Sequence, residues 1–246
     1  MGHINYIVYA IENIDYNTVA SGAGDSTIKI WRISTGATIS SITTSSPIYN
    51  LILLSNGYLA CGLTSSNNNL LLWNYTNGIL ENSLNGHTSS VNYLEILSDQ
   101  YLASASSDTR VIIWNLTETR SIGYTLISHT GPVWIVKRLS DKLLASGGAG
   151  DFSLRIWNWN SGQLIRILAG HTSTIYWSME LFDDYTLISG SMDTTIKFWN
   201  ISTGNLIRNI NTNMAIDSMS MIKTCNIFFY NFKLAKEALY PLKQIS

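Results

Sequence analysis

The sequence has little proline and little charge. Three prolines occur in 246 residues, so few strands would be interrupted by a residue that cannot donate a backbone hydrogen bond. Charged residues make up 13% of the chain and the net charge is −1. Because no basic run is present to neutralise a phosphate backbone, we expect no nucleic-acid partner.

Long apolar runs and cysteines are scarce as well. No apolar run approaches the ~18 residues of a membrane-spanning helix, and no secretory signal peptide is visible. The two cysteines, Cys61 and Cys225, lie far apart in the sequence, which favours a reduced compartment. We therefore expect no membrane partner and a cytoplasmic location, with the nucleus as the alternative.

What the sequence does contain is a tryptophan on a fixed period. Trp31, Trp73, Trp114, Trp157 and Trp199 are separated by 42, 41, 43 and 42 residues. A period of this length indicates one supersecondary unit copied along the chain. Short β-branched and aromatic runs between clusters of turn residues predict that the unit is an antiparallel all-β meander.

Three further residue types recur with the tryptophan. In four copies a histidine precedes it by 27 or 28 residues, and a serine and an aspartate lie between them. The four sets are His3, Ser21, Asp25 and Trp31; His87, Ser104, Asp108 and Trp114; His129, Ser146, Asp151 and Trp157; and His171, Ser189, Asp193 and Trp199.

The unit resembles the WD40 repeat, which has a Gly-His pair, a strand ending near Ser-Gly, a turn with Asp and a strand closing on Trp-Asp. Trp-Asn or Trp-Arg stands here in place of Trp-Asp. The resemblance implies an all-β propeller with one four-stranded blade per repeat. Five blades are predicted at about residues 2–43, 44–85, 86–127, 128–169 and 170–212.

Residues 213–246 are predicted to form a degenerate, partial sixth blade and a C-terminal tail. Residues 213–219 and 226–231 are its candidate strands, and residues 233–240 have the pattern of a short amphipathic helix. Whether the ring of blades closes is left open. An unclosed ring exposes strand edges, so self-association through such an edge is one expectation.

Ser, His and Asp together are the ingredients of an acyl-transfer triad, but a catalytic triad occurs once and this set occurs four times. In WD40 relatives these side chains and the tryptophan form a buried hydrogen-bond chain, so the resemblance implies a structural role for all four sets. We expect no catalytic residues, no metal site and no cofactor. The second repeat, with Cys61 at the serine position and Asn67 near the aspartate position, should lack the chain.

Propeller relatives bind partners on the face around the central channel. The exposed position on this face is the residue that follows the first buried aliphatic residue of each innermost strand. These residues are Tyr9, Tyr49, Asn92, Trp134 and Trp177. Blades 1 and 5 carry one extra residue before this strand, so Val8 and Tyr176 are the alternatives there. Four of these five are aromatic, a type that dominates binding hot spots. The residues before the turn aspartates would rim the same face: Gly24, Ser107, Gly150 and Met192.

The sequence favours a non-enzymatic scaffold that holds a protein or peptide partner on this face. One alternative is a degenerate fragment without a function of its own. The other is an enzyme or small-ligand propeller that uses the channel, for which the innermost strands offer Glu95, Lys137, Glu180 and Asp217.

Overall fold

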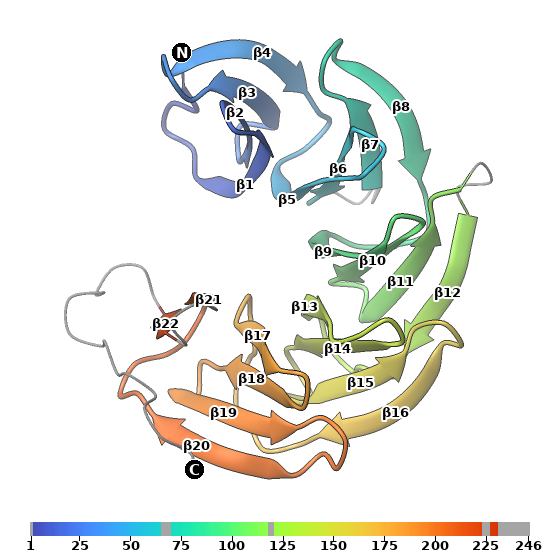
Figure 1. Cartoon of the computed structure of the whole chain (residues 1–246), viewed down its shortest axis with the longest axis vertical. Coiled ribbons are helices and arrows are strands. Elements are labelled where there is room, and N and C mark those ends of the chain that lie inside the picture. Colours follow the sequence, from blue (N-terminus) through green and yellow to red (C-terminus); the bar gives the residue numbers. More distant parts are fainter. Residues whose placement is uncertain (1, 65–69, 118–120, 223–226, 231–246) are drawn as a thin grey trace. The chain divides into compact units, whose positions relative to one another are not determined.

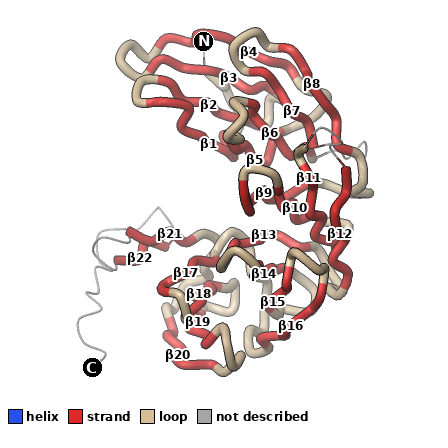
Figure 2. Tube along the Cα trace, turned by 45° about the vertical axis from the view of Figure 1, so that its right-hand side comes forward, coloured by secondary structure: helices blue, strands red, loops and turns tan. Residues whose placement is uncertain are grey.

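The chain folds into antiparallel sheets of four strands, each built from one stretch of sequence. The computed structural model describes residues 2–64, 70–117, 121–222 and 227–230. These residues contain strands and connecting turns, and no helix among them could cross a membrane (Figure 2). They divide into two compact units, Met1–Thr125 and Leu126–Ser246, which are described separately.

The first unit contains three sheets. Sheet 1 consists of β1 (Val8–Asp15), β2 (Thr18–Ala23), β3 (Thr27–Arg32) and β4 (Ala37–Thr43). Sheet 2 consists of β5 (Ile48–Leu53), β6 (Tyr58–Leu63), β7 (Leu70–Asn74) and β8 (Ile79–Leu84). Sheet 3 consists of β9 (Val91–Ser98), β10 (Tyr101–Ser106), β11 (Arg110–Asn115) and β12 (Ser121–Ile127), and the unit boundary falls within β12.

The second unit contains two four-stranded sheets and a smaller one. Sheet 4 consists of β13 (Val133–Arg138), β14 (Leu143–Gly148), β15 (Leu154–Asn158) and β16 (Gln163–Leu168). Sheet 5 consists of β17 (Met179–Asp183), β18 (Thr186–Gly190), β19 (Thr195–Asn200) and β20 (Leu206–Asn211). Sheet 6 is the pair β21 (Met219–Ile222) and β22 (Ile227–Tyr230).

Within every four-stranded sheet the strands follow one another in chain order (Figure 1). The five sheets fall one in each predicted repeat, and the predicted all-β, propeller-type fold class is confirmed. How the ring closes stays a prediction. The predicted helix at residues 233–240, Asn67 and Cys225 lie outside the described residues.

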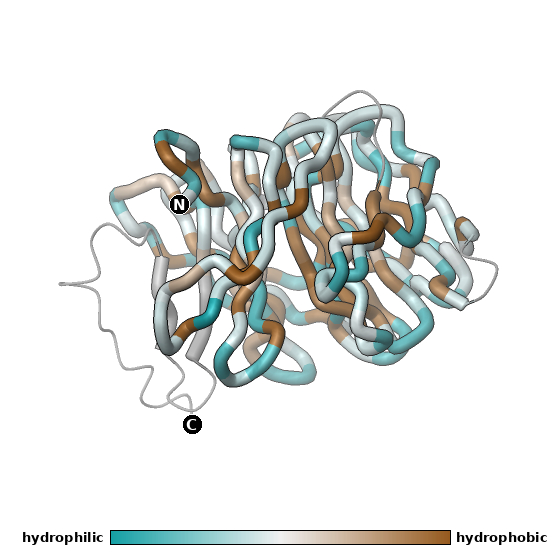
Figure 3. The backbone as a smooth tube through the Cα atoms, turned by 90° about the horizontal axis from the view of Figure 1, so that it is seen from above, coloured by the Kyte–Doolittle hydropathy of each residue, from teal (hydrophilic) through white to brown (hydrophobic). Residues whose placement is uncertain are grey.

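The third strands of sheets 2 to 5 are almost wholly buried, whereas β3 of sheet 1 alternates buried and partly exposed residues. In β11 the consecutive residues Val111, Ile112, Ile113 and Trp114 are each at most 2% exposed. The fourth strands are the most exposed: β12 and β20 are exposed along most of their length, and β4 and β16 alternate exposed and covered residues. Figure 3 shows apolar stretches along the strands and many hydrophilic residues in the turns.

The sixth sheet departs from the predicted strand positions. Its first strand begins at Met219, whereas residues 213–219 were expected to form it. The preceding segment is used by sheet 5: Thr212 N donates to Thr194 O and Ile216 N donates to Ser191 O. Ile216 and Met219 pack with Ile188 and Phe198 of sheet 5, so the start of the sixth repeat is anchored on the fifth.

Candidate functional site

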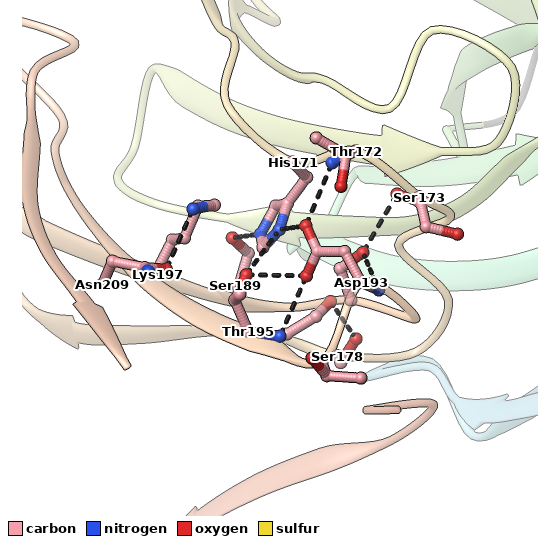
Figure 4. Close-up of polar contacts among 12 residues, drawn as sticks. His171, Thr172, Ser173, Ser178, Ser189, Asp193, Thr195, Lys197 and Asn209 are labelled. Atoms are coloured by element: carbon pink, nitrogen blue, oxygen red, sulfur yellow. Dashed lines mark hydrogen bonds and ion pairs between the residues drawn. The ribbon is translucent and has the colours of Figure 1, made fainter. Parts of the chain in front are cut away.

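Four hydrogen-bond chains, one each in sheets 1, 3, 4 and 5, join the recurrent His, Ser, Asp and Trp side chains. The histidine Nδ1 lies 2.8–3.1 Å from an aspartate oxygen. Its Nε2 lies 2.6–2.8 Å from the serine Oγ. The tryptophan Nε1 donates to the same Oγ over 2.6–2.8 Å. Figure 4 shows the chain of sheet 5, with His171 between Ser189 and Asp193.

The chemistry of the indole fixes the direction of the tryptophan–serine hydrogen bond. An indole N–H can only donate, so the serine Oγ accepts from tryptophan and its own O–H donates to histidine Nε2. A neutral histidine in this arrangement carries its proton on Nδ1 and donates it to the aspartate, as His171 does to Asp193. In sheet 4 the Arg155 Nη1 atom, which can only donate, also lies 2.7 Å from His129 Nδ1.

The aspartate also shapes the turn between the second and third strands. In sheet 5, Asp193 accepts from Thr195 N at 2.9 Å, from Thr195 Oγ1 at 2.6 Å and from Thr172 N at 3.0 Å. The next residue, Thr194, has a φ of +66°, a left-handed conformation that this side chain-to-backbone bonding supports. One carboxylate therefore connects the segment around His171 to the β18–β19 turn.

Sheet 4 carries an additional cation in its chain. Arg155 Nη1 lies 3.0 Å from Asp151 Oδ2, and the guanidinium also donates to Ser128 Oγ at 2.9 Å and Ser128 O at 3.0 Å. Ser128 stands where other repeats have glycine before the histidine. Ser128 and Arg155, the two residues that depart from the repeat pattern, are therefore hydrogen-bonded to each other. Burial alone would raise the pKa of Asp151, but hydrogen bonds from His129 and Thr130 hold it well below its usual range.

Sheet 2 lacks a comparable chain among its described residues. Cys61 occupies the serine position and is fully buried. Trp73 Nε1 is also buried, and among the described residues it has no hydrogen-bond partner at normal geometry. Burial raises the pKa of the Cys61 thiol to about 12, against a smaller opposing influence of the Trp73 indole, so the thiol stays neutral and unreactive.

The predicted partner-binding residues lie at irregularities of the first strands. The pairing register shifts between Val8 and Ala10, between Ile48 and Asn50, and between Val133 and Ile135. Tyr9, Tyr49 and Trp134 are the extra residues in these bulges. A bulge removes its residue from the alternation of the strand and re-aims its side chain.

The aromatic residues at these positions gather in each unit. In the first unit the Tyr9 and Tyr49 rings meet edge to face, with centroids 4.9 Å apart. In the second unit Trp134 meets Trp177 at 5.7 Å and Tyr176 at 5.0 Å, again nearly edge to face. The Tyr9 residue is 40% exposed and the other four rings are half-buried, so the clusters present ring surface to solvent.

The sequence predicted Tyr176 only as an alternative to Trp177 for the exposed position. In the structure both rings belong to the same cluster. The strand pairing Met179↔Ser189 places Trp177 at the position that Trp134 holds in sheet 4. Trp177 also bridges to the sixth repeat, since its N donates to Asp217 O at 3.1 Å.

Asn92 departs from the expectation of an exposed position. It is fully buried, and its side-chain amide exchanges hydrogen bonds with Ser107 Oγ at 3.0 and 3.2 Å. An amide is small enough to turn back onto the neighbouring turn, which a tyrosine or tryptophan ring cannot do. In sheet 3 this position therefore offers no surface to a partner.

The predicted rim residues hold equivalent backbone positions in three repeats. Gly24 N donates to Ile7 O, Ser107 N to Ser90 O and Met192 N to Thr174 O, each at 2.9 Å. Met192 is 40% exposed, so its thioether lies at the surface of the second unit. In sheet 4 Ala149, not Gly150, makes this bond, because the turn has one additional residue, Gly150, with a φ of +89°.

Comparison with known proteins decides the family. A family model described as "WD domain, G-beta repeat" matches residues 1–32, 78–115, 120–158 and 162–200, which together are more than half of the chain. The chain belongs to the WD40 family. The unmatched stretch between residues 32 and 78 holds most of the WD40 repeat in which Cys61 replaces serine.

Individual relatives match parts of this WD40 chain. It is 36% identical over 97 residues to "Cell division cycle 20.1, cofactor of APC complex" of Arabidopsis thaliana, covering 39% of this chain and 21% of the relative. It is 28% identical over 158 residues to "Autophagy-related protein 16" of Arabidopsis thaliana, covering 61% of this chain and 30% of the relative. The chain thus spans between about a fifth and a third of the length of these relatives.

Among solved structures, that of U3-55K matches with a TM-score of 0.80 and 21% identity, over 94% of this chain and 75% of the other. At that identity the likeness shows the WD40 propeller fold alone.

Sequence reasoning missed Arg155 and the hydroxyl groups that complete the aspartate turns, such as those of Thr27 and Thr195. Ser128 at a glycine position was the signal for Arg155, since a polar residue in that place needs a partner. The hydroxyl two residues after the turn aspartate, in three of the four WD40 sets, was a second signal.

The WD40 hydrogen-bond chains predict that stability falls as the pH is lowered. Burial lowers the pKa of His171 and His129, with Asp193 and Asp151 opposing the effect and Arg155 adding to it at His129. For a histidine whose pKa is lowered by folding, the stabilisation is complete above the unfolded pKa of about 6.5 and is lost as pH falls through the folded value. The melting temperature should therefore fall between pH 7.5 and pH 5.

A further fall is expected below pH 4. Burial alone would raise the pKa of Asp108, but hydrogen bonds from the His87 side chain and from the backbone N–H groups of Thr88 and Arg110 hold it below its ordinary value. Its stabilisation is present above the unfolded pKa of about 3.9 and is lost as pH falls through the lower folded value. Thermal melts at constant ionic strength would check both steps, and a melting temperature that is flat or rising from pH 7.5 to 5 contradicts the assignment of neutral histidines.

Proposed function

We propose that this chain is a non-catalytic interaction module that binds a protein or peptide partner through the aromatic residues at its first-strand bulges. The observation that carries the proposal is the recurrence of a partly exposed ring at the same irregular position in four repeats: Tyr9, Tyr49, Trp134 and Trp177. A large ring with two side-chain torsions loses little entropy when a partner covers it, so it contributes strongly to binding.

The second unit offers the larger surface for such a partner. Trp134, Tyr176 and Trp177 form one cluster, and Met192 lies at the end of the neighbouring turn. Aromatic and methionine side chains are enriched at the core of interfaces, where charged groups are depleted. The partner expected here is therefore a peptide segment or loop that inserts an apolar side chain against these rings.

Charged groups on the first strands support a binding role over a catalytic one. Lys137 and Glu180 hold equivalent places in sheets 4 and 5, and they pair with each other at 3.0 Å. Each side chain is about one-fifth exposed, and its charge is neutralised by the other. An ion pair of this kind links sheets 4 and 5 and leaves neither group unpaired for catalysis. The naming of one relative as a cofactor of the APC complex also agrees with an adaptor role.

Variants of the two tryptophans test the proposal. Trp134→Ala and Trp177→Ala should each reduce the amount of partner captured from a lysate of the source cells by tenfold or more, about 1.4 kcal/mol or above. Tyr185→Ala is the matched control, because Tyr185 is a 67% exposed aromatic residue at the β17–β18 turn of the same sheet. Quantitative mass spectrometry of the captured proteins gives the readout, and retention of every partner by both tryptophan variants would show that another face binds.

A further inference from the structure

The dipeptide Asn-Gly occurs three times in the chain, each time in the first unit. The sites are Asn56-Gly57, Asn77-Gly78 and Asn85-Gly86. All three asparagines are exposed. Asparagine is a thermolabile residue, and a following glycine increases its reactivity because no Cβ atom keeps the glycine nitrogen away from the preceding side-chain amide. The structure distinguishes the three sites by the bonds that these two groups make.

Two of the sites lie in tight turns that engage the glycine nitrogen. Gly57 N donates to Leu54 O, and Gly78 N donates to Asn74 O, both over 2.9 Å. The φ angles of these glycines, +83° and +72°, lie in the left-handed region that favours glycine. A glycine nitrogen that donates in this way has to lose its hydrogen bond before it can react with the neighbouring side chain.

The asparagine side chains of these turns are held as well. Asn56 Oδ1 accepts from Tyr58 N at 3.2 Å, and Asn77 Oδ1 accepts from Ile79 N at 2.9 Å. Such side chain-to-backbone bonds are typical of asparagine in turns. Ring closure between the side-chain carbonyl carbon and the next nitrogen requires a rotation about the Asn Cα–C bond, so the turn has to open first. The folded turns therefore protect these two sites.

The third site, Asn85-Gly86, lies in the irregular connection that follows the end of β8 at Leu84. Within the described part of the chain Gly86 N donates no hydrogen bond, and Asn85 Oδ1 accepts one, from Ser83 Oγ at the long distance of 3.4 Å. Gly170, which precedes the histidine of sheet 5 in the same way, likewise has no backbone donor bond to a described residue. No strong hydrogen bond to these residues therefore restrains the two reacting groups.

Gly86 is seated on the side chains of sheet 3. A Cβ atom added to Gly86 would lie 2.8 Å from Ile122 Cδ1, 3.0 Å from Trp114 Cη2 and 3.1 Å from Ile112 Cδ1. The packing therefore requires glycine at this position, which keeps the Asn-Gly dipeptide in place. The next residue, His87, is the histidine of the hydrogen-bond chain in the same sheet.

We propose that Asn85 is a site of spontaneous deamidation, from which the two turn asparagines are protected. Gly86 N gives up its proton to a solvent base and attacks Asn85 Cγ, and ammonia leaves, so that a cyclic imide forms. Water, the only co-reactant, then opens the imide. Attack at the side-chain carbonyl gives aspartate. Attack at the backbone carbonyl gives isoaspartate, in which the main chain runs through Cβ and Cγ to Gly86.

Isoaspartate lengthens the main chain at a place where both sides are fixed. Leu84 is buried at the end of β8, and Gly86 and His87 are packed on sheet 3. His87 Nδ1 lies 2.8 Å from Asp108 Oδ2, and Thr88 N donates to the same oxygen at 2.9 Å. An extra main-chain atom between these anchors has to displace one of them. The modification should therefore weaken the hydrogen-bond chain of sheet 3.

The test compares the three sites in one molecule. The intact folded chain and the same chain in guanidinium chloride are incubated in parallel at pH 8. Cleavage after Tyr58 and Glu81 separates the sites, and fragment ions assign the mass gain of deamidation. In denaturant the three rates should agree within about threefold, because every site is followed by glycine. In the folded chain Asn85 should react at least about tenfold faster than Asn56 and Asn77, because their turns must open locally first.

Two results of this comparison would overturn the proposal. One is a rate at Asn85 that folding lowers as much as it lowers the rates at the two turn sites. The other is a folded chain in which all three asparagines react as fast as in denaturant, since the turns would then give no protection.

The consequence for sheet 3 is tested by thermal melts of incubated material. Chains with isoaspartate at position 85 should melt at least about 6 °C below the fresh chain. Asn85→Asp, which has the new charge without the longer main chain, should stay within about 2 °C of the fresh chain. Asn85→Gln should not change during the same incubation. A chain that contains isoaspartate at position 85 and melts like the fresh one would overturn the inferred effect on sheet 3.

Discussion

Replacing Asp193 by alanine is expected to lower the free energy of unfolding by about 3–5 kcal/mol. The carboxylate accepts hydrogen bonds from His171 Nδ1, Thr172 N, Thr195 N and Thr195 Oγ1. Its side chain is 6% exposed, so water cannot fully replace it for the donors left behind. Urea unfolding followed by tryptophan fluorescence at pH 7.5 measures the change.

Asp183→Ala is the matched control for this experiment. Asp183 ends β17 of the same sheet, is exposed and accepts one hydrogen bond, from Tyr185 N at 2.8 Å. Its loss should cost at most about 1 kcal/mol. Equal unfolding midpoints for the two variants would show that the buried hydrogen-bond chain contributes no more to stability than a single hydrogen bond in an exposed turn.

The second large effect is expected from Gly148→Ala, at about 2 kcal/mol or more. A Cβ atom at Gly148 would collide with the carbonyl oxygen of Pro132 and lie 2.9 Å from Val133 Cα. Both atoms belong to the backbone at the start of β13, so relief requires that strand to move away from β14.

Gly24→Ala provides the comparison for Gly148→Ala. Its added Cβ would meet Tyr6 Cδ1 at 3.5 Å, an ordinary contact, and its φ lies outside the left-handed region. The unfolding free energy of that variant should stay within about 0.5 kcal/mol of the parent. Similar losses for the two variants would mean that the β13–β14 approach is looser than the structure shows.

Much of this fold could be predicted because the residues that build it recur. The spacing from Trp31 to Trp199 predicted one sheet per period, since a repeated unit must bury its apolar surface against its neighbours. The aromatic residues at the bulges, such as Tyr49 and Trp134, were found from the same alignment. Periodicity carries this information even where no single strand is distinctive.

What the sequence could not provide depends on contacts that occur once. Arg155 occupies a third-strand position where other repeats have lysine, leucine or isoleucine, and its ion pair with Asp151 follows from the local geometry of one sheet. The burial of Asn92 depends on a nearby hydroxyl, that of Ser107. The start of β21 could not be placed, because backbone bonds to sheet 5 take up the preceding segment.

The bulges on the first strands have a consequence for how such a chain can evolve. Their side chains lie outside the strand alternation, and the buried chains from tryptophan to aspartate use none of them. Substitution at Tyr9, Tyr49 or Trp134 therefore changes the outward surface while the ladders on both sides keep their register. On the proposed function, such a chain can acquire new partners at these sites without compensating mutations, because the residues proposed to bind and the residues that hold the fold are different members of the same repeat.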